Sequence, residues 1–186
     1  MKKIIIAHGW GNKPTDIWFP WAKKTFEAKG YQVIIPQLPD SDHPKIGTWI
    51  PALKAAAGEV NEETVMIGFS MGGQTIMRFL EGLPEGKMIG KVIFVAGFGP
   101  YLKGLEPEEE PIWKPWKESP IDYEKVRSKA SSFSAFFSDN DPWVKLEENS
   151  RLFKEKFDAK IIIKHNMSHF NEAANVTELP DLLKLI

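Results

Sequence analysis

A serine lies between two glycines in the stretch Gly-Phe-Ser-Met-Gly, after a short apolar run and before a segment with helical periodicity. In a sharp turn from a strand to a helix, the neighbouring backbone leaves no room for side chains two residues before or after the serine. Gly68 and Gly72 meet this requirement. The pattern therefore predicts a nucleophilic Ser70, with the amide of Met71 placed to stabilise an oxyanion. Taken by itself, the pattern also fits a glycine-rich turn with a capping serine.

Two aspartates and two histidines follow later apolar runs, and they are the candidates for the partners that a serine nucleophile requires. A general base must remove the serine proton, and a carboxylate must orient that base. We select Asp141 over Asp139, because Pro142 restricts Asp141 to extended backbone. An Asp-Pro pair also fits a helix N-cap, and Asp139 is more typical of a turn. Of the two histidines, we select His169 over His165, because it lies nearer to the next predicted helix.

The spacing of four between His165 and His169 raises the alternative of a metal site. The pair straddles a predicted loop and lacks the glutamate of a His-Glu-x-x-His motif, so we expect no metal here. The chain contains no cysteine, which excludes disulfides, thiolate metal sites and cysteine nucleophiles. We therefore predict a site without a metal or a cofactor.

A second glycine-containing loop, His-Gly-Trp-Gly at residues 8–11, follows the first apolar run. Such a loop can present free backbone amides, and the amide of Trp10 is the candidate for the second oxyanion donor. The alternative is a plain strand-exit turn with a packed tryptophan. We interpret His8 as a structural hydrogen-bonding residue and His43 as a solvated loop residue.

Strands and helices must alternate along the chain to bring these residues together. Continuous runs of mostly β-branched or aromatic residues are typical of strands that are covered on both faces. The expected strands are residues 4–6, 33–35, 65–67, 92–95, 133–137 and 161–163, and the expected helices are residues 18–29, 48–57, 72–83, 123–128, 145–157 and 179–185. This alternation predicts an α/β fold with about six mostly parallel strands and helices on both faces. Its ligands would bind at the carboxyl ends of the strands.

One segment, residues 101–123, breaks the alternation with a composition rich in proline, glutamate and tryptophan. A segment of this length without periodicity is typical of a functional loop or lid within a domain. We predict that Trp113 and Trp116 from this insertion line the substrate pocket together with Trp143 and Phe170. The alternative is that Trp113 and Trp116 only anchor the insertion.

Composition limits the organisation and the partners of the chain. A length of 186 residues suits one domain, 1–186, with a core large enough to need no disulfide. The net charge is -1, so we expect neither nucleic acid nor an anionic membrane as a partner. No apolar stretch has the length of a membrane span or of a signal peptide core. We expect a cytoplasmic protein that acts on a small neutral molecule, and the sequence predicts no oligomeric state.

The order Ser70, Asp141, His169 is the order of the α/β-hydrolase triad. With the His-Gly-x-Gly loop, the Asp-Pro pair, the Ser-His-Phe at residues 168–170 and the tryptophan-containing insertion, the sequence resembles small α/β hydrolases of the retinoblastoma-binding protein 9 and YdeN type. The resemblance covers nearly the whole chain and implies the compact α/β-hydrolase fold. It also implies the nucleophile, acid and base named above, with oxyanion amides from Trp10 and Met71. Phe69 departs from the relatives, which often have a histidine beside the serine.

The resemblance and the residues together predict a serine hydrolase that cleaves small carboxylic esters through an acyl-enzyme. Expelling an alcohol asks less of the general acid than expelling an amine, so an ester is favoured over an amide. Two alternatives stay open at this point. One is a thioesterase or amidase that uses the same residues, and the other is a non-catalytic binding protein on the same fold.

Overall fold

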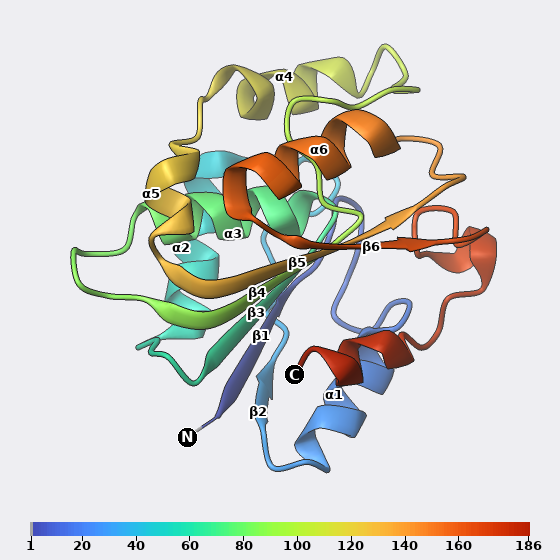
Figure 1. Cartoon of the computed structure of the whole chain (residues 1–186). Coiled ribbons are helices and arrows are strands. Elements are labelled where there is room, and N and C mark those ends of the chain that lie inside the picture. Colours follow the sequence, from blue (N-terminus) through green and yellow to red (C-terminus); the bar gives the residue numbers. More distant parts are fainter. Residues whose placement is uncertain (1) are drawn as a thin grey trace.

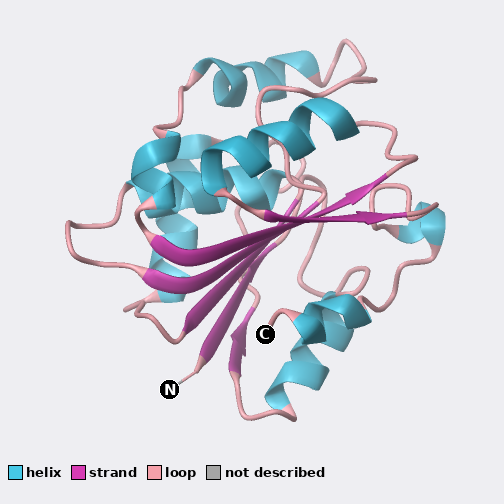
Figure 2. Ribbon diagram, viewed as in Figure 1, coloured by secondary structure: helices cyan, strands magenta, loops and turns pink. Residues whose placement is uncertain are grey.

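The computed structural model describes residues 2–186, which form a six-stranded sheet between two layers of helices (Figure 1; Figure 2). The strands are β1 (Lys3–Ala7), β2 (Gln32–Ile34), β3 (Thr64–Phe69), β4 (Ile89–Val95), β5 (Ala130–Ser138) and β6 (Lys160–Lys164). Each expected strand is present. Neighbouring strands are all parallel, in the order β2-β1-β3-β4-β5-β6.

The helices are α1 (Phe19–Glu27), α2 (Ile46–Ala57), α3 (Met71–Glu81), α4 (Glu110–Glu118), α5 (Tyr123–Arg127) and α6 (Leu146–Phe157), with two 3₁₀ turns, η1 (Glu172–Ala174) and η2 (Pro180–Lys184). In Figure 1, α1 and η2 lie on one face of the sheet, and α2, α3, α5 and α6 lie on the other. The helix expected at residues 179–185 is the 3₁₀ turn η2, which spans only five residues. A helix of five residues forms few hydrogen bonds of its own and depends on support at its ends. The equally short α5 has such support, because the side chain of Asp122 accepts from the amide of Lys125, whereas η2 has no side-chain cap.

The core is deepest at β3 and α3. All six residues of β3 are buried, and so is every residue of α3 from Met71 to Leu80. The expectation of two covered faces fails at β6, where Ile163 is 48% exposed. β6 is the edge strand and pairs with β5 alone, and at this edge the elements that cover the faces of the sheet leave the Ile163 side chain open to solvent.

The strand order reverses between β1 and β3, and this reversal determines where the loops after these two strands lie. The chain leaves β1 toward β2 on one side and returns to β3 on the other side. In a parallel sheet, a crevice forms at the carboxyl ends of two strands whose connections diverge in this way. The loop after β1 carries Trp10, and the turn after β3 carries Ser70.

The insertion at residues 101–123 contains α4, which the sequence analysis did not predict. The buried guanidinium of Arg78 in α3 fixes the end of this helix: its Nη2 donates to the carbonyl oxygens of Trp116 at 2.7 Å and of Ser119 at 2.8 Å. The Arg78 guanidinium also lies over the Trp116 ring, 5.3 Å from its centroid. Burial lowers the pKa of Arg78 to about 10, which leaves it charged at neutral pH. A cation at the carboxyl end of a helix complements the helix dipole.

Candidate active site

Ser70 occupies a strained turn between β3 and α3. Its backbone has φ 51 and ψ -120, a conformation that residues with side chains rarely adopt. A Cβ atom added to Gly68 would lie 2.6 Å from the Cα of Gly73, and one added to Gly72 would lie 2.0 Å from the carbonyl oxygen of Ala7. Both contacts are with backbone, which cannot move aside. The steric interpretation of the Gly-x-Ser-x-Gly pattern is therefore confirmed.

His169 and Asp141 form a buried pair across the ends of β5 and β6. The Nδ1 of His169 donates to Asp141 Oδ2 over 2.7 Å, and the two side chains are 9% and 2% exposed. The other carboxylate oxygen of Asp141 accepts from the amides of Trp143 at 2.9 Å and Val144 at 3.0 Å. With Nδ1 protonated and held, the other ring nitrogen of His169 is the one free to act as a base.

The loop that carries His169 is held by polar side chains at the end of β5. Asn166, Ser168 and Phe170 have positive φ values of 56, 46 and 54, so the backbone turns sharply on both sides of His169. Ser138 Oγ accepts from the amide of Met167 at 3.0 Å, and Asn140 Oδ1 accepts from the amide of Ser168 at 2.8 Å. Neither Ser138 nor Asn140 stands out in the sequence, because their role depends on contacts between segments far apart in the chain.

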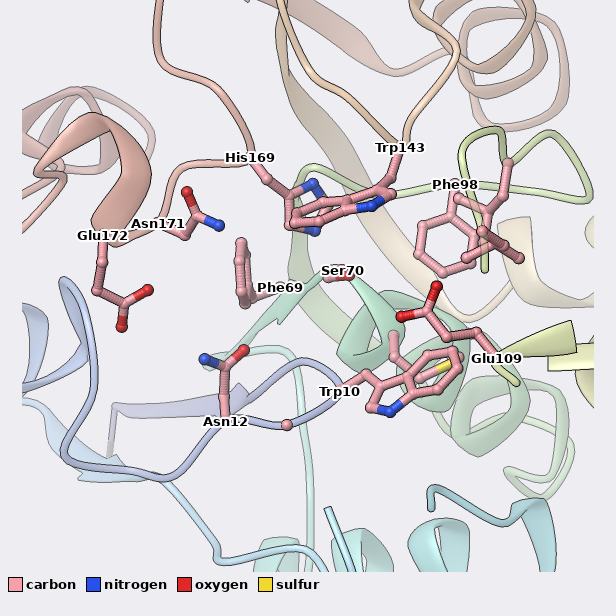
Figure 3. A pocket seen from close by; sticks show the side chains of 14 residues that line it. Trp10, Asn12, Phe69, Ser70, Phe98, Glu109, Trp143, His169, Asn171 and Glu172 are labelled. Atoms are coloured by element: carbon pink, nitrogen blue, oxygen red, sulfur yellow. The ribbon is translucent and has the colours of Figure 1, made fainter. Parts of the chain in front are cut away.

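Ser70 and His169 line the same pocket, and aromatic rings surround the imidazole (Figure 3). The ring centroids of Phe69 and His169 are 5.3 Å apart. The ring of Trp143 meets the imidazole edge-on, with 4.9 Å between the two centroids. Within residues 2–186, Ser70 Oγ makes no hydrogen bond, so the serine and the imidazole are near but not bonded. Such bonds are often long before a substrate binds.

Trp10 and Met71 also line the pocket, and their backbone amides are the two expected oxyanion donors. Met71 is the first residue of α3, and an amide in that position has no partner within its own helix. The amide of Trp10 donates to no carbonyl of the described chain. The Trp10 loop is held from outside, since its indole Nε1 donates to the Asp42 carbonyl at 2.9 Å and the amide of Gly11 donates to the Ser41 carbonyl at 2.8 Å.

His8 is a structural residue in this arrangement. It is fully buried, its Nδ1 donates to the carbonyl of Gly9 at 2.9 Å, and its Nε2 accepts from the amide of Leu38 at 2.9 Å. Burial lowers the pKa of His8, which favours the neutral ring and matches the acceptor role of Nε2. His8 thus ties the loop after β1 to the loop after β2 and does not line the pocket.

The pocket above Ser70 has a volume of about 310 Å³. Its lining combines the residues discussed so far with side chains from the insertion and from the loop after β6. The full lining is Trp10, Gly11, Asn12, Phe69, Ser70, Met71, Phe98, Leu102, Leu105, Glu109, Trp143, His169, Asn171 and Glu172. A volume of this size suits a small substrate.

Three of the four aromatic side chains expected in the pocket lie elsewhere. Trp143 lines it, but Trp113, Trp116 and Phe170 do not. Trp113 and Trp116 are each 2% exposed, because they share the inner face of α4 and pack into the core. Trp113 meets the Phe98 ring at 5.3 Å, and Trp116 donates from Nε1 to the Pro44 carbonyl at 2.9 Å.

Phe170 is fully buried, so it faces the core while its neighbour His169 faces the pocket. The pocket residues that were not expected from the sequence belong to loops or, for Glu172, to the three-residue turn η1, where no periodicity marks an inward face. They are Asn12, Phe98, Leu102, Leu105, Glu109, Asn171 and Glu172.

The two residues set aside in the sequence analysis, Asp139 and His165, pair with each other. His165 Nδ1 lies 2.6 Å from Asp139 Oδ2, and Asp139 Oδ1 accepts from the amide of Asn166 at 2.9 Å. Neither residue lines the pocket.

Across residues 2–186, no cluster of three or more His, Cys, Asp or Glu side chains is arranged to hold a metal ion. In the same residues, no helix has the length and apolar character to cross a membrane.

Comparison with known proteins identifies the family of the chain. A family model described as serine hydrolase matches residues 4–186. The chain belongs to the serine hydrolase family. It is 30% identical over 179 residues to the putative hydrolase YdeN of Bacillus subtilis (strain 168), covering 96% of this chain and 91% of YdeN. It is 25% identical over 188 residues to the serine hydrolase RBBP9 of Rattus norvegicus, covering 98% of this chain and 91% of that protein.

Solved structures show the same architecture. The crystal structure of the ydeN gene product from B. subtilis matches with a TM-score of 0.90 and 27% identity, over 100% of this chain and 96% of that one. The structure of Est1E from Butyrivibrio proteoclasticus with ferulic acid bound matches with a TM-score of 0.72 and 15% identity, over 99% and 89% of the two chains. At that identity, the likeness to Est1E concerns the fold alone. The expected family and the compact α/β-hydrolase fold are confirmed.

Proposed function

We propose that this member of the serine hydrolase family cleaves small carboxylic esters, with Ser70 as nucleophile, His169 as general base and Asp141 as the acid that orients the base. The observation that carries the proposal is the buried 2.7 Å contact between His169 Nδ1 and Asp141 Oδ2, in a pocket that also contains Ser70. This contact fixes the imidazole tautomer that a serine nucleophile requires.

The reaction would run in two halves. His169 accepts the Ser70 proton as Oγ attacks the carbonyl carbon, and Asp141 stabilises the imidazolium that results. The imidazolium then gives its proton to the departing alcohol, which leaves an acyl-enzyme. Water attacks the acyl-enzyme with His169 again as base, and the carboxylic acid is released while Ser70 regains its proton.

The amides of Trp10 and Met71 would stabilise the oxyanion of each tetrahedral intermediate. Donors of this kind contribute roughly 3 kcal/mol each at measured sites. Their partner-free state supports the assignment, because a donor aimed at a transition state must not be occupied by the protein itself. Trp10 is additionally held by the loop at residues 41–42, so its amide would need little reorganisation during the reaction.

The experiment that tests this proposal is labelling with a serine-directed fluorophosphonate, followed by intact-protein mass spectrometry. We expect one added group on the folded protein, and none on Ser70→Ala or on heat-unfolded protein. A folded protein that takes no label would contradict the proposed nucleophile and would favour a non-catalytic binding protein on this fold. Chromogenic short-chain esters, thioesters and aminoacyl anilides, tested side by side, then decide between an esterase, a thioesterase and an amidase.

A further inference from the structure

The pocket has two chemically different ends, with Ser70 between them (Figure 3). On one side lie Phe98 and Trp143, with Glu109 as the charged residue there. Leu102 of the insertion also lines the pocket and forms a β-bridge with Val144, next to Trp143, which adds to the apolar character of this end. On the other side lie three polar side chains, Asn12, Asn171 and Glu172, around the ring of Phe69. A substrate that reaches Ser70 therefore extends one group toward an apolar wall and another toward a polar wall.

The ionised side chains that line the pocket are all acidic. Glu109 and Glu172 line it, and no lysine or arginine does, although the whole chain holds 24 basic and 25 acidic residues. Within the described residues, neither glutamate forms an ion pair. The pocket thus carries negative charge that the protein does not neutralise locally.

The two glutamates differ in what the fold asks of them. Glu109 Oε2 accepts from the amide of Glu106 at 2.8 Å, so it has a structural task at the start of α4. The Glu172 carboxylate makes no hydrogen bond within residues 2–186, and it begins η1, a turn of only three residues. Asn12 likewise makes no side-chain hydrogen bond to the described chain. The polar end therefore offers a free carboxylate and a free amide to a ligand.

We propose, on the basis of the function above, that this pocket selects its substrate by charge. It accepts esters with an apolar group on the insertion side and an ammonium group at the Asn12, Asn171 and Glu172 end. It rejects esters that carry a carboxylate at that end. The cause is electrostatic: a cation within a few ångströms of Glu172 is attracted and an anion is repelled. Glu172 is exposed, so the effect is that of a charge in contact with water and is screened by salt.

The test uses three esters of one acyl group whose alcohols match in size. The first alcohol carries a trimethylammonium group, the second is its neutral tert-butyl analogue, and the third carries a carboxylate. At low salt we expect kcat/KM to be about five-fold higher for the cationic ester than for the neutral one, and about ten-fold lower for the anionic one. Both ratios should shrink toward one as salt rises above about 0.5 M, because exposed charges are screened.

Charge-removing variants assign the effect to a residue. In Glu172→Gln, the ratio of kcat/KM for the cationic ester to that for the neutral ester should fall close to one. Because both values come from the same variant, a general loss of activity cancels in the ratio. Glu155→Gln is the matched control, since Glu155 is an exposed glutamate of α6 outside the pocket, and its ratio should equal that of the unmodified protein. Equal rates for the three esters, or an unchanged ratio in Glu172→Gln, would overturn the proposal.

Binding to Ser70→Ala separates this proposal from the proposed function. The variant cannot form an acyl-enzyme, so the affinities of the ammonium alcohol and its tert-butyl analogue, measured by calorimetry, report selection alone. If Ser70→Ala binds the ammonium compound more tightly but the unmodified protein hydrolyses no ester, the esterase function is overturned and charge selection stands. If the unmodified protein hydrolyses the esters but Ser70→Ala binds both compounds equally, charge selection is overturned and the esterase function stands.

Discussion

Two aspartate–histidine pairs join the ends of β5 and β6, and they differ in surroundings rather than in geometry. The contact between Asp139 and His165 is 2.6 Å, and that between Asp141 and His169 is 2.7 Å. The His165 side chain is 81% exposed, whereas that of His169 is 9% exposed and lies between two aromatic rings beside Ser70. A short contact therefore does not identify a base. What distinguishes the candidate base is burial and the group that its second nitrogen faces.

Removing the carboxylate from each pair is the strongest way to test this difference. In Asp141→Asn, the imidazole loses the acceptor that fixes its tautomer, and we expect kcat for an activated ester to fall by about 10³- to 10⁴-fold. Asp139→Asn should stay within about two-fold of the unmodified protein, since Asp139 lies outside the pocket. Steady-state kinetics measures both, with circular dichroism as the check on folding. Equal losses in the two variants would show that the assignment of Asp141 is wrong.

A smaller effect is expected at Asn140, which lies between the two aspartates in the sequence. Its Oδ1 accepts from the amide of Ser168 at 2.8 Å, and Ser168 directly precedes His169. In Asn140→Ala, that amide loses its partner, and we expect unfolding to become easier by about 1 kcal/mol. A displaced imidazole should also lower kcat by about ten-fold. Urea unfolding and kinetics on one preparation check both, and unchanged kcat with reduced stability would show that the loop does not depend on this bond for its position.

The smallest effect concerns the exposed pair and the response to acid. The amide of Asn166, followed by His165, lowers the pKa of Asp139 below its ordinary value of 3.8. A lowered pKa stabilises the folded state above pH 3.8, and this contribution disappears as the pH falls through the lowered value. Asp139→Asn should therefore differ in stability from the unmodified protein above pH 3.8 and converge with it in stronger acid. Thermal unfolding from about pH 2 to about pH 7 measures this, and curves that remain parallel throughout would contradict it.

The strands of the sheet and the three candidate catalytic residues could be predicted from the sequence, because both depend on local patterns. Each strand contains a short, mostly apolar run, and Ser70, Asp141 and His169 follow the ends of three such runs. The helix α4 could not be predicted in this way, because Pro111 and Pro115 obscure its pattern. Its stability comes from elsewhere in the chain, through the contacts of its carboxyl end with Arg78.

The walls of the pocket were the least predictable part. Trp113 and Trp116 are three residues apart, which puts them on one face of a helix, and α4 turns that face toward the core rather than toward Ser70. Glu172 reaches the pocket from the short turn η1 and Asn12 from the loop after β1, and the course of both segments depends on tertiary contacts. Composition could identify the insertion as unusual, but not which of its side chains would face a ligand.

Ser70 lies at the joint between the two most deeply buried elements, β3 and α3. Amides in such a place exchange with solvent only when the whole sheet opens, whereas loops and edges open on their own. The strained turn cannot persist once either element is lost, since it exists only while the backbone around Gly72 stays packed against β1. The reactivity of this serine should therefore be an all-or-none property of each molecule, which makes a covalent probe at Ser70 a direct count of folded chains.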